Sequence, residues 1–147
     1  MQTNFTTLKQ QLSGELFDSD LVKTLYATDA SVYRELPYAV AIPKTTEDIK
    51  RLIEFAALNE LSIIPRAAGT SLAGQCVGDG IVVDVSKYMN DILEINTQEQ
   101  WVRVQPGVVR DHLNTFLKPY GFFFGPNTST ANRCTMGGMV GNNSCGS

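Results

Sequence analysis

Residues 37–66 read PYAVAIPKTTEDIKRLIEFAALNELSIIPR, and the fold class follows from this stretch. Residues 38–42 are a short apolar run between two prolines, which is typical of a buried strand rather than a helix. Thr45 and Asp48 have the spacing of a capping box, and apolar residues at helical spacing follow them. Because residues 61–64 are a second β-rich run, the order strand–helix–strand predicts a parallel pair joined by a right-handed crossover.

The next part of the chain predicts a third strand and then a change of architecture. Residues 80–85 are another β-rich run and complete a small parallel unit. Residues 92–95 and 101–105 lie on either side of a polar loop and predict an antiparallel hairpin, and a helix is expected over about residues 108–118. We therefore predict an α+β fold, in which a small parallel α/β subdomain is followed by the start of a second, mainly antiparallel α+β subdomain.

Residues 1–36 are expected to form a helical lead-in to a domain at residues 37–147. Apolar side chains from Phe5 to Leu16 recur near helical spacing, which predicts one amphipathic helix over about the first fifteen residues. A second helix is expected near residues 21–26.

Composition and charge exclude several classes of protein. With 147 residues, 43% hydrophobic and 18% charged, the chain has the composition of a globular domain rather than a disordered tail or a coiled coil. The net charge is −3 and no run of Lys and Arg occurs, so a nucleic-acid partner is not expected. No apolar run approaches the roughly 18 residues that a membrane helix needs. We expect a cytoplasmic protein without a membrane span.

Metal sites and hydrolytic triads are also poor candidates. The three cysteines lack C-x-x-C spacing, and His112 is the only histidine, so no zinc motif is available and we expect no metal site. We expect His112 to be a packed or half-exposed structural residue. Arg66 and Arg133 each have two interpretations, as residues that face an anion or as surface salt-bridge partners, and for Arg133 we favour the salt bridge. Cys134 and Cys145 are expected to be small buried hydrophobes.

The first candidate binding segment is residues 65–75, PRAAGTSLAGQ, directly after the second parallel strand. Ligands in open α/β sheets bind beyond the carboxyl ends of strands. Gly69 and Gly74 have the spacing of a P-loop, but Gln75 and Cys76 replace its Lys and Ser/Thr, and no G-x-G-x-x-G is present. The small residues predict a loop whose backbone N–H groups converge on an anion, helped by the adjoining Thr and Ser hydroxyls. An ordinary glycine-bearing turn remains the alternative.

The second candidate is residues 125–146, GPNTSTANRCTMGGMVGNNSCG. Its glycines allow the backbone to approach a flat group, and its Asn and Thr side chains offer donors and acceptors to a heterocycle. The alternative is a disordered tail, against which the interleaved Cys, Met and Val argue. No closing helix or strand is expected here, and because the chain ends inside this stretch we expect a fragment of a longer protein.

Together these two segments resemble the FAD-linked oxidases with a vanillyl-alcohol-oxidase-type, or PCMH-type, FAD-binding domain. The resemblance rests on RAAGTS at residues 66–71, and on TMGGMVGNNSCG at residues 135–146. It covers almost the whole chain, because residues 26–31 and 39–43 also fit the family's N-terminal lead-in. The FAD-binding domain is expected at residues 37–147 and is incomplete at its C-terminal end. The chain is most similar to the D-lactate, glycolate and D-2-hydroxyglutarate dehydrogenases, particularly the large ones that append an iron–sulfur region.

The resemblance implies cofactor contacts at twelve positions. Backbone groups of the first segment would hold the FAD pyrophosphate, and the second segment would line the cofactor toward its ring. These residues are Arg66, Ala67, Ala68, Gly69, Thr70, Ser71, Pro126, Thr135, Gly137, Gly138, Asn142 and Asn143.

Two of these positions depart from the family pattern. Ala67 and Ala68 stand where many relatives have glycine, so both are expected to have negative φ. Thr70 stands where covalently flavinylated relatives have a histidine, so noncovalent FAD is expected.

The resemblance further implies a small hydroxy-acid substrate, oxidised to the 2-oxo acid by hydride transfer to FAD. The electron acceptor is unknown. The catalytic groups would lie beyond Ser147, so no catalytic residue is assigned, and an iron–sulfur cluster would belong to that part as well. We expect these 147 residues alone to be inactive and prone to form homo-oligomers through an unpaired sheet edge.

Two other functions stay open. One is a nucleotide-binding module without redox turnover. The other is a different enzyme on the same flavin scaffold, such as a UDP-sugar enolpyruvyl reductase, which residues 135–146 disfavour.

Overall fold

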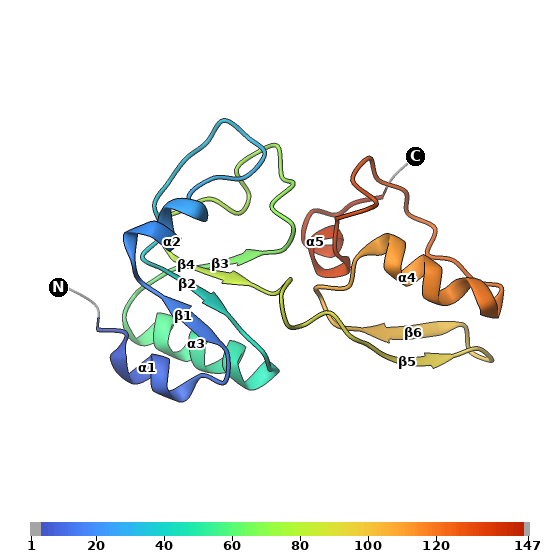
Figure 1. Ribbon diagram of the computed structural model, residues 1–147, viewed down its shortest axis with the longest axis horizontal. Coiled ribbons are helices and arrows are strands. Elements are labelled where there is room, and N and C mark those ends of the chain that lie inside the picture. The colour runs from blue at the N-terminus through green and yellow to red at the C-terminus, as the bar shows by residue number, and fades with distance from the viewer. Residues whose placement is uncertain (1–3, 146–147) are drawn as a thin grey trace.

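The computed structural model describes residues 4–145 and contains two sheets that lie side by side (Figure 1). The elements in chain order are α1 Thr6–Gln11, β1 Glu15–Phe17, α2 Asp20–Leu25, β2 Ala39–Ile42, α3 Thr46–Leu58, β3 Ile63–Arg66, β4 Ile81–Asp84, β5 Ile92–Asn96, β6 Trp101–Val104, α4 Arg110–Leu117, the 3-10 helix η1 Lys118–Tyr120 and α5 Met136–Gly141. None of the helices within residues 4–145 has the length and apolar character to span a membrane.

The first sheet has four strands in the order β1-β2-β4-β3. Strand β4 is parallel to both of its neighbours, with Val82 opposite Val40 of β2 and Ile64 of β3. Both β2 and β4 are buried along their whole length, as a central parallel strand requires. The predicted strand–helix–strand unit is therefore confirmed.

The N-terminal segment differs from the expected single helix. Helix α1 ends at Gln11, and residues 15–17 instead form an antiparallel edge strand on β2. Gly14 requires this change, because a Cβ at this position would lie 2.3 Å from the Ile42 carbonyl oxygen. The apolar side chains from Phe5 to Leu16 therefore pack into one core, but they come from two elements, α1 and β1. The predicted division at residue 37 stays a prediction, although β1 joins the lead-in to the sheet.

The carboxylate of Asp48 fixes the start of helix α3 to the N-terminal segment. Its side chain is 1% exposed and accepts hydrogen bonds from the amides of Ser13 (2.8 Å) and Gly14 (3.1 Å). The amides of Lys44 and Thr45 bond the same group at 2.9 and 3.2 Å. Burial acts to raise the pKa of Asp48, but these backbone hydrogen bonds outweigh it and the pKa is lowered. The predicted capping box is confirmed.

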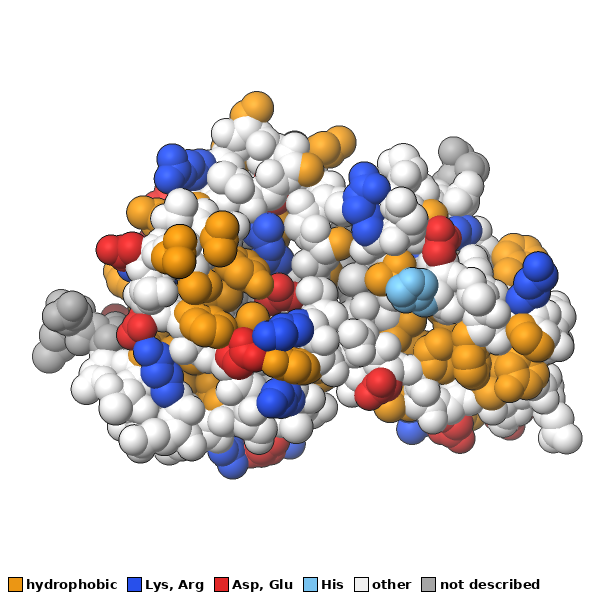
Figure 2. Space-filling view, viewed as in Figure 1, with side chains coloured by type: hydrophobic (Ala, Val, Ile, Leu, Met, Phe, Trp, Pro, Cys, Tyr) orange, Lys and Arg blue, Asp and Glu red, His pale blue; other side chains and the backbone are white. Residues whose placement is uncertain are grey.

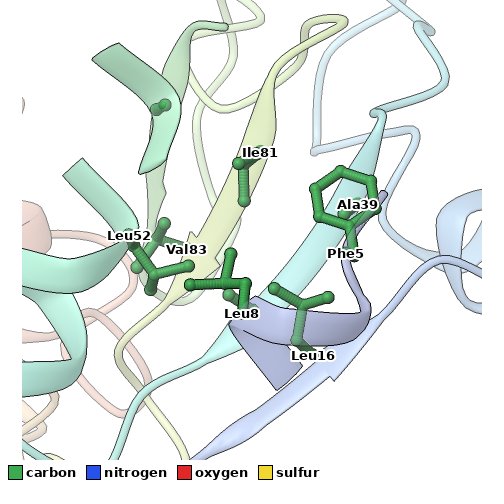
Figure 3. Close-up of a cluster of buried hydrophobic side chains, with 9 residues drawn as sticks. Phe5, Leu8, Leu16, Ala39, Leu52, Ile81 and Val83 are labelled. Carbon is green, nitrogen blue, oxygen red and sulfur yellow. The ribbon is translucent and has the colours of Figure 1, made fainter. Parts of the chain in front are cut away.

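Helices α1 and α3 cover one face of the first sheet and enclose its core (Figure 1). Leu8 of α1 and Phe5, just before that helix, pack with Leu52 of α3. Together they cover Ile81 and Val83 of β4 (Figure 3). Each fully buried large aliphatic side chain contributes about 1.5–3 kcal/mol, so this face supplies the main stabilisation of the first half.

The second half is the β5–β6 hairpin with helix α4 packed on it, as predicted. Leu113 and Leu117 are buried against Val102 and Val104 of the hairpin. Between the halves the space-filling view shows mainly backbone and uncharged side chains (Figure 2). Gly107 lies at this join, where its amide donates to the Met89 carbonyl at 2.7 Å.

We expect Asp48→Ala to lower the free energy of unfolding by about 2–4 kcal/mol, because four partly buried backbone amides lose a charged acceptor. Equilibrium urea unfolding measures the loss, with Glu54→Ala, an exposed site on the same helix, as the control. Since the folded-state pKa lies below the unfolded value of about 3.9, the stabilisation is complete above that pH and is lost as pH falls through the folded pKa. If the difference in unfolding free energy between Asp48→Ala and the parent protein does not shrink on acidification, this account is contradicted.

Candidate functional site

Residues 66–75, here named the cradle loop, leave the sheet at the carboxyl end of β3. Within residues 4–145, the backbone N–H groups of residues 67–72 donate no hydrogen bond to another residue. Gly69 and Gly74 have φ of 65° and 70°, whereas Ala67 and Ala68 do not have positive φ, as expected. The loop therefore presents a run of unengaged amides, which is the feature that anion-binding loops share.

The Ser71 hydroxyl folds the cradle loop instead of extending from it. Its Oγ donates to the Gln75 side chain at 2.8 Å and accepts from the amides of Ala73 and Gln75, each at 3.2 Å. Short hydroxyl side chains commonly form such local turns. In this structure the Ser71 hydroxyl proton is used within the loop, and its expected help in binding an anion stays a prediction. No hydrogen bond engages the neighbouring Thr70 hydroxyl within the described residues.

Arg66 braces the cradle loop from behind. Its guanidinium donates to the Thr28 carbonyl at 2.8 Å and lies 5.2 Å from the centre of the Tyr26 ring. A Cβ at Gly69 would lie 2.7 Å from Arg66 Nη2, so the loop passes directly over the guanidinium. The charge of Arg66 is therefore used within the protein to hold the loop.

Tyr26 helps Arg66 to support the loop, a role that sequence analysis did not predict. Its hydroxyl donates to Asp84 Oδ2 at 2.8 Å, and Asp84 Oδ1 accepts from the amide and hydroxyl of Ser86 at 2.8 and 2.6 Å. Burial, and then the hydrogen bond to Asp84, raise the pKa of Tyr26 to about 12. Tyr26, from the N-terminal lead-in, thus connects the carboxyl ends of β3 and β4 beneath the cradle loop.

The second segment contains a helix, α5, where none was expected. The Thr135 hydroxyl caps it by accepting from the Gly138 amide at 3.3 Å, and Thr135 is 2% exposed. A Cβ at Gly137 would lie 2.6 Å from Pro106 Cβ, and one at Gly138 would lie 3.0 Å from Ala67 Cβ. These glycines therefore allow α5 to pack closely, and Gly138 brings the two predicted segments into contact.

The other predicted residues of this segment lie farther out. Asn142 and Asn143 are exposed at the end of α5, where Asn143 has φ of 51°. Pro126 is held from α4, because Arg110 Nε donates to its carbonyl at 2.7 Å. The Arg110 side chain is only 13% exposed, and sequence analysis did not single it out.

A cavity of about 490 Å³ lies between the halves. Its walls include Ala68 of the cradle loop, Thr135 before α5, His112 of α4 and Arg133. His112 is exposed, which agrees with the half-exposed form of the expectation and not with the packed form. Arg133 has no carboxylate within 4.0 Å among the described residues, so the expected salt bridge is absent there.

Two cysteine expectations have different outcomes. Cys134 is buried as expected, with its sulfur 3.1 Å from the Thr128 hydroxyl, whereas Cys145 is exposed. Cys145 lies just past the end of α5, where little of the described chain packs over it.

Comparison with known proteins agrees with this arrangement. Residues 37–147 match the family described as "FAD binding domain". The chain belongs to this family. It is 47% identical over 148 residues to a D-2-hydroxyglutarate dehydrogenase of Pantoea ananatis, and the match covers 98% of the chain and 14% of that relative. It is also 36% identical to glycolate oxidase subunit GlcD of Bacillus subtilis, over 92% of the chain and 30% of the relative.

Solved structures show the same fold. An alkyldihydroxyacetonephosphate synthase superposes with a TM-score of 0.82 at 20% identity, covering 98% of this chain and 30% of the other. The 6-hydroxy-D-nicotine oxidase of Arthrobacter nicotinovorans superposes with a TM-score of 0.68 at 25% identity, and the match covers 81% of this chain and 26% of the other. The predicted α+β, PCMH-type fold is confirmed. The chain spans only a small part of its relatives.

We expect Gly69→Val to raise the dissociation constant for FAD at least tenfold, because a branched side chain strains the positive φ and collides with Arg66. Gly121→Val is the matched control, since Gly121 has φ of 76° but nothing within 4 Å of an added Cβ. Flavin fluorescence titration measures the affinity for FAD. Thermal unfolding compares how much stability each variant loses through its strained backbone. Equal FAD affinity in both variants would count against the cradle loop.

Proposed function

We propose that this chain is the FAD-binding part of a flavin-dependent dehydrogenase that oxidises a D-2-hydroxy acid to the 2-oxo acid. Four D-2-hydroxyglutarate dehydrogenases are 43–47% identical to it. The glycolate oxidase subunit is 36% identical to the chain, and a D-lactate dehydrogenase of Kluyveromyces lactis is 33% identical to it. This difference favours a substrate of the D-2-hydroxyglutarate type over lactate or glycolate.

The unengaged amides of the cradle loop carry the proposal. A pyrophosphate needs several donors at close range and little side-chain bulk, and residues 67–72 supply both. The positive φ of Gly69 and the packing of Gly138 on Ala67 keep the loop and the second segment in contact. The residues present therefore fit the diphosphate of FAD.

FAD supplies the hydride acceptor, and the protein binds and orients it. The cradle loop amides would hold the phosphates, with Arg66 and Tyr26 keeping the loop in place from behind. Residues 126 and 135–143 would line the path from the phosphates toward the ring. No group of this chain is assigned to proton transfer.

A nucleotide-binding module without redox turnover is the alternative. A full-length protein that binds flavin but does not reduce it with any hydroxy acid would favour that alternative. Anaerobic bleaching of the flavin absorbance by D-2-hydroxyglutarate would support the dehydrogenase.

We expect FAD to be released intact by acid precipitation, because Thr70 offers no imidazole for a covalent bond. The measurement is the flavin absorbance of supernatant and pellet after denaturation. Flavin that stays in the pellet contradicts noncovalent binding.

We expect the full-length protein to turn over D-2-hydroxyglutarate with higher kcat/KM than D-lactate or glycolate, using an artificial electron acceptor. The 147 residues alone should show no turnover, because the proposed catalytic groups are not among them. Activity of the isolated 147 residues would mean that those groups lie within the described sites.

A further inference from the structure

The cavity between the halves has two basic side chains on its wall and no carboxylate among the residues that line it. Arg133 and His112 reach it from the second half, and Ala68 of the cradle loop reaches it from the first. Figure 2 shows the histidine at the surface of the second half, over α4. The cavity therefore adjoins the run of unengaged amides.

Most other polar side chains of the cavity are already engaged. The Ser86 hydroxyl bonds Asp84 at 2.6 Å, and Asn90 Nδ2 lies 3.4 and 3.3 Å from the carbonyls of residues 86 and 87. The buried Thr135 hydroxyl caps α5. A ligand in this cavity would meet donors chiefly from Arg133, His112 and the cradle loop.

Arg133 keeps most of its donors. Its Nη1 bonds only the neighbouring Asn132 side chain at 2.9 Å, and a guanidinium has five N–H groups. Arg110, in contrast, is paired with Asp111 and with the Pro126 carbonyl. A guanidinium that lacks a carboxylate partner on a cavity wall favours an oxyanion ligand, which it binds through two parallel hydrogen bonds.

The part of the cradle loop that lines the cavity carries no cation. Gln75 stands where a P-loop has its lysine. Arg66 lies behind the loop, where its Nη1 donates to the Thr28 carbonyl and its guanidinium faces the Tyr26 ring. Two negative charges held by amides alone would gain from a nearby positive side chain. The second half offers one on the shared cavity.

We propose that Arg133 and His112 bind the pyrophosphate of the dinucleotide from the side of the second half, and so complete the site that the cradle loop begins. The inference rests on the proposed function, because it assumes FAD as the ligand. It assigns the cation on the cavity wall to Arg133, which the sequence analysis interprets as a surface salt-bridge partner. It also makes the two halves depend on each other for binding.

The test compares Arg133→Gln and His112→Gln with Arg103→Gln in the full chain. Arg103 is 66% exposed on β6 and loses the same charge away from the cavity. Affinities for FAD, ADP and riboflavin are measured at low and high NaCl, and circular dichroism confirms folding. ADP carries the pyrophosphate without the flavin ring, and riboflavin carries the ring without the phosphates.

We expect Arg133→Gln to weaken FAD and ADP binding alike, by about tenfold, and to reduce the salt dependence, because one charge-assisted contact is lost. His112→Gln should have a smaller effect of the same kind, Arg133→Lys should restore part of the affinity, and riboflavin binding should not change.

Unchanged FAD and ADP affinity in both variants would overturn the inference while leaving the proposed function intact. An effect confined to the KM for the hydroxy acid would also overturn it and would assign the cavity to a substrate carboxylate. Failure of the unaltered full chain to bind FAD would overturn both.

Discussion

Close packing at two glycines sets how the two halves meet. A Cβ at Gly107 would lie 2.6 Å from the Val85 carbonyl oxygen, and one at Gly138 would lie 3.0 Å from Ala67 Cβ of the cradle loop. Gly137 packs α5 on Pro106 within the second half. A side chain at Gly107 would therefore force the halves apart, and one at Gly138 would press on the cradle loop. The candidate site exists only at this separation, since its walls come from both sheets.

The N-terminal segment contributes to the site although the family match begins at residue 37. Asp48 ties the segment before β1 to helix α3 through the two amides of Ser13 and Gly14. Farther along, Tyr26 bonds Asp84 at the end of β4 and lies under the Arg66 guanidinium. Stability and site geometry are therefore coupled, because the same N-terminal segment adds a strand to the sheet and braces the binding loop.

Sequence analysis predicted most of the fold and located both binding segments. Apolar runs of four residues and the Thr45 cap are local signals, so the strands and α3 agreed with expectation. The end of α1 and the existence of α5 depended on contacts with residues far along the chain, namely Ile42, Pro106 and Ala67. The roles of Arg66 and Arg110 could not be predicted for the same reason, because their side chains bond partners that no sequence spacing identifies. The turn at Ser71 is local, since its partners are two and four residues away, and sequence analysis overlooked it.

The site also shows how a short loop binds a charged group with few charged residues. Hydroxyl and carboxylate side chains around the cradle loop are used to fix its shape, as Ser71, Thr135 and Asp84 show. A side chain engaged in this way gives rigidity, and rigidity lowers the entropy lost when a ligand binds. The amides of residues 67–72 stay available, and the positive φ of Gly69 turns the loop among them. Specificity for a diphosphate then arises from the geometry of the amides, and the strength of binding depends on which cations can reach the same cavity.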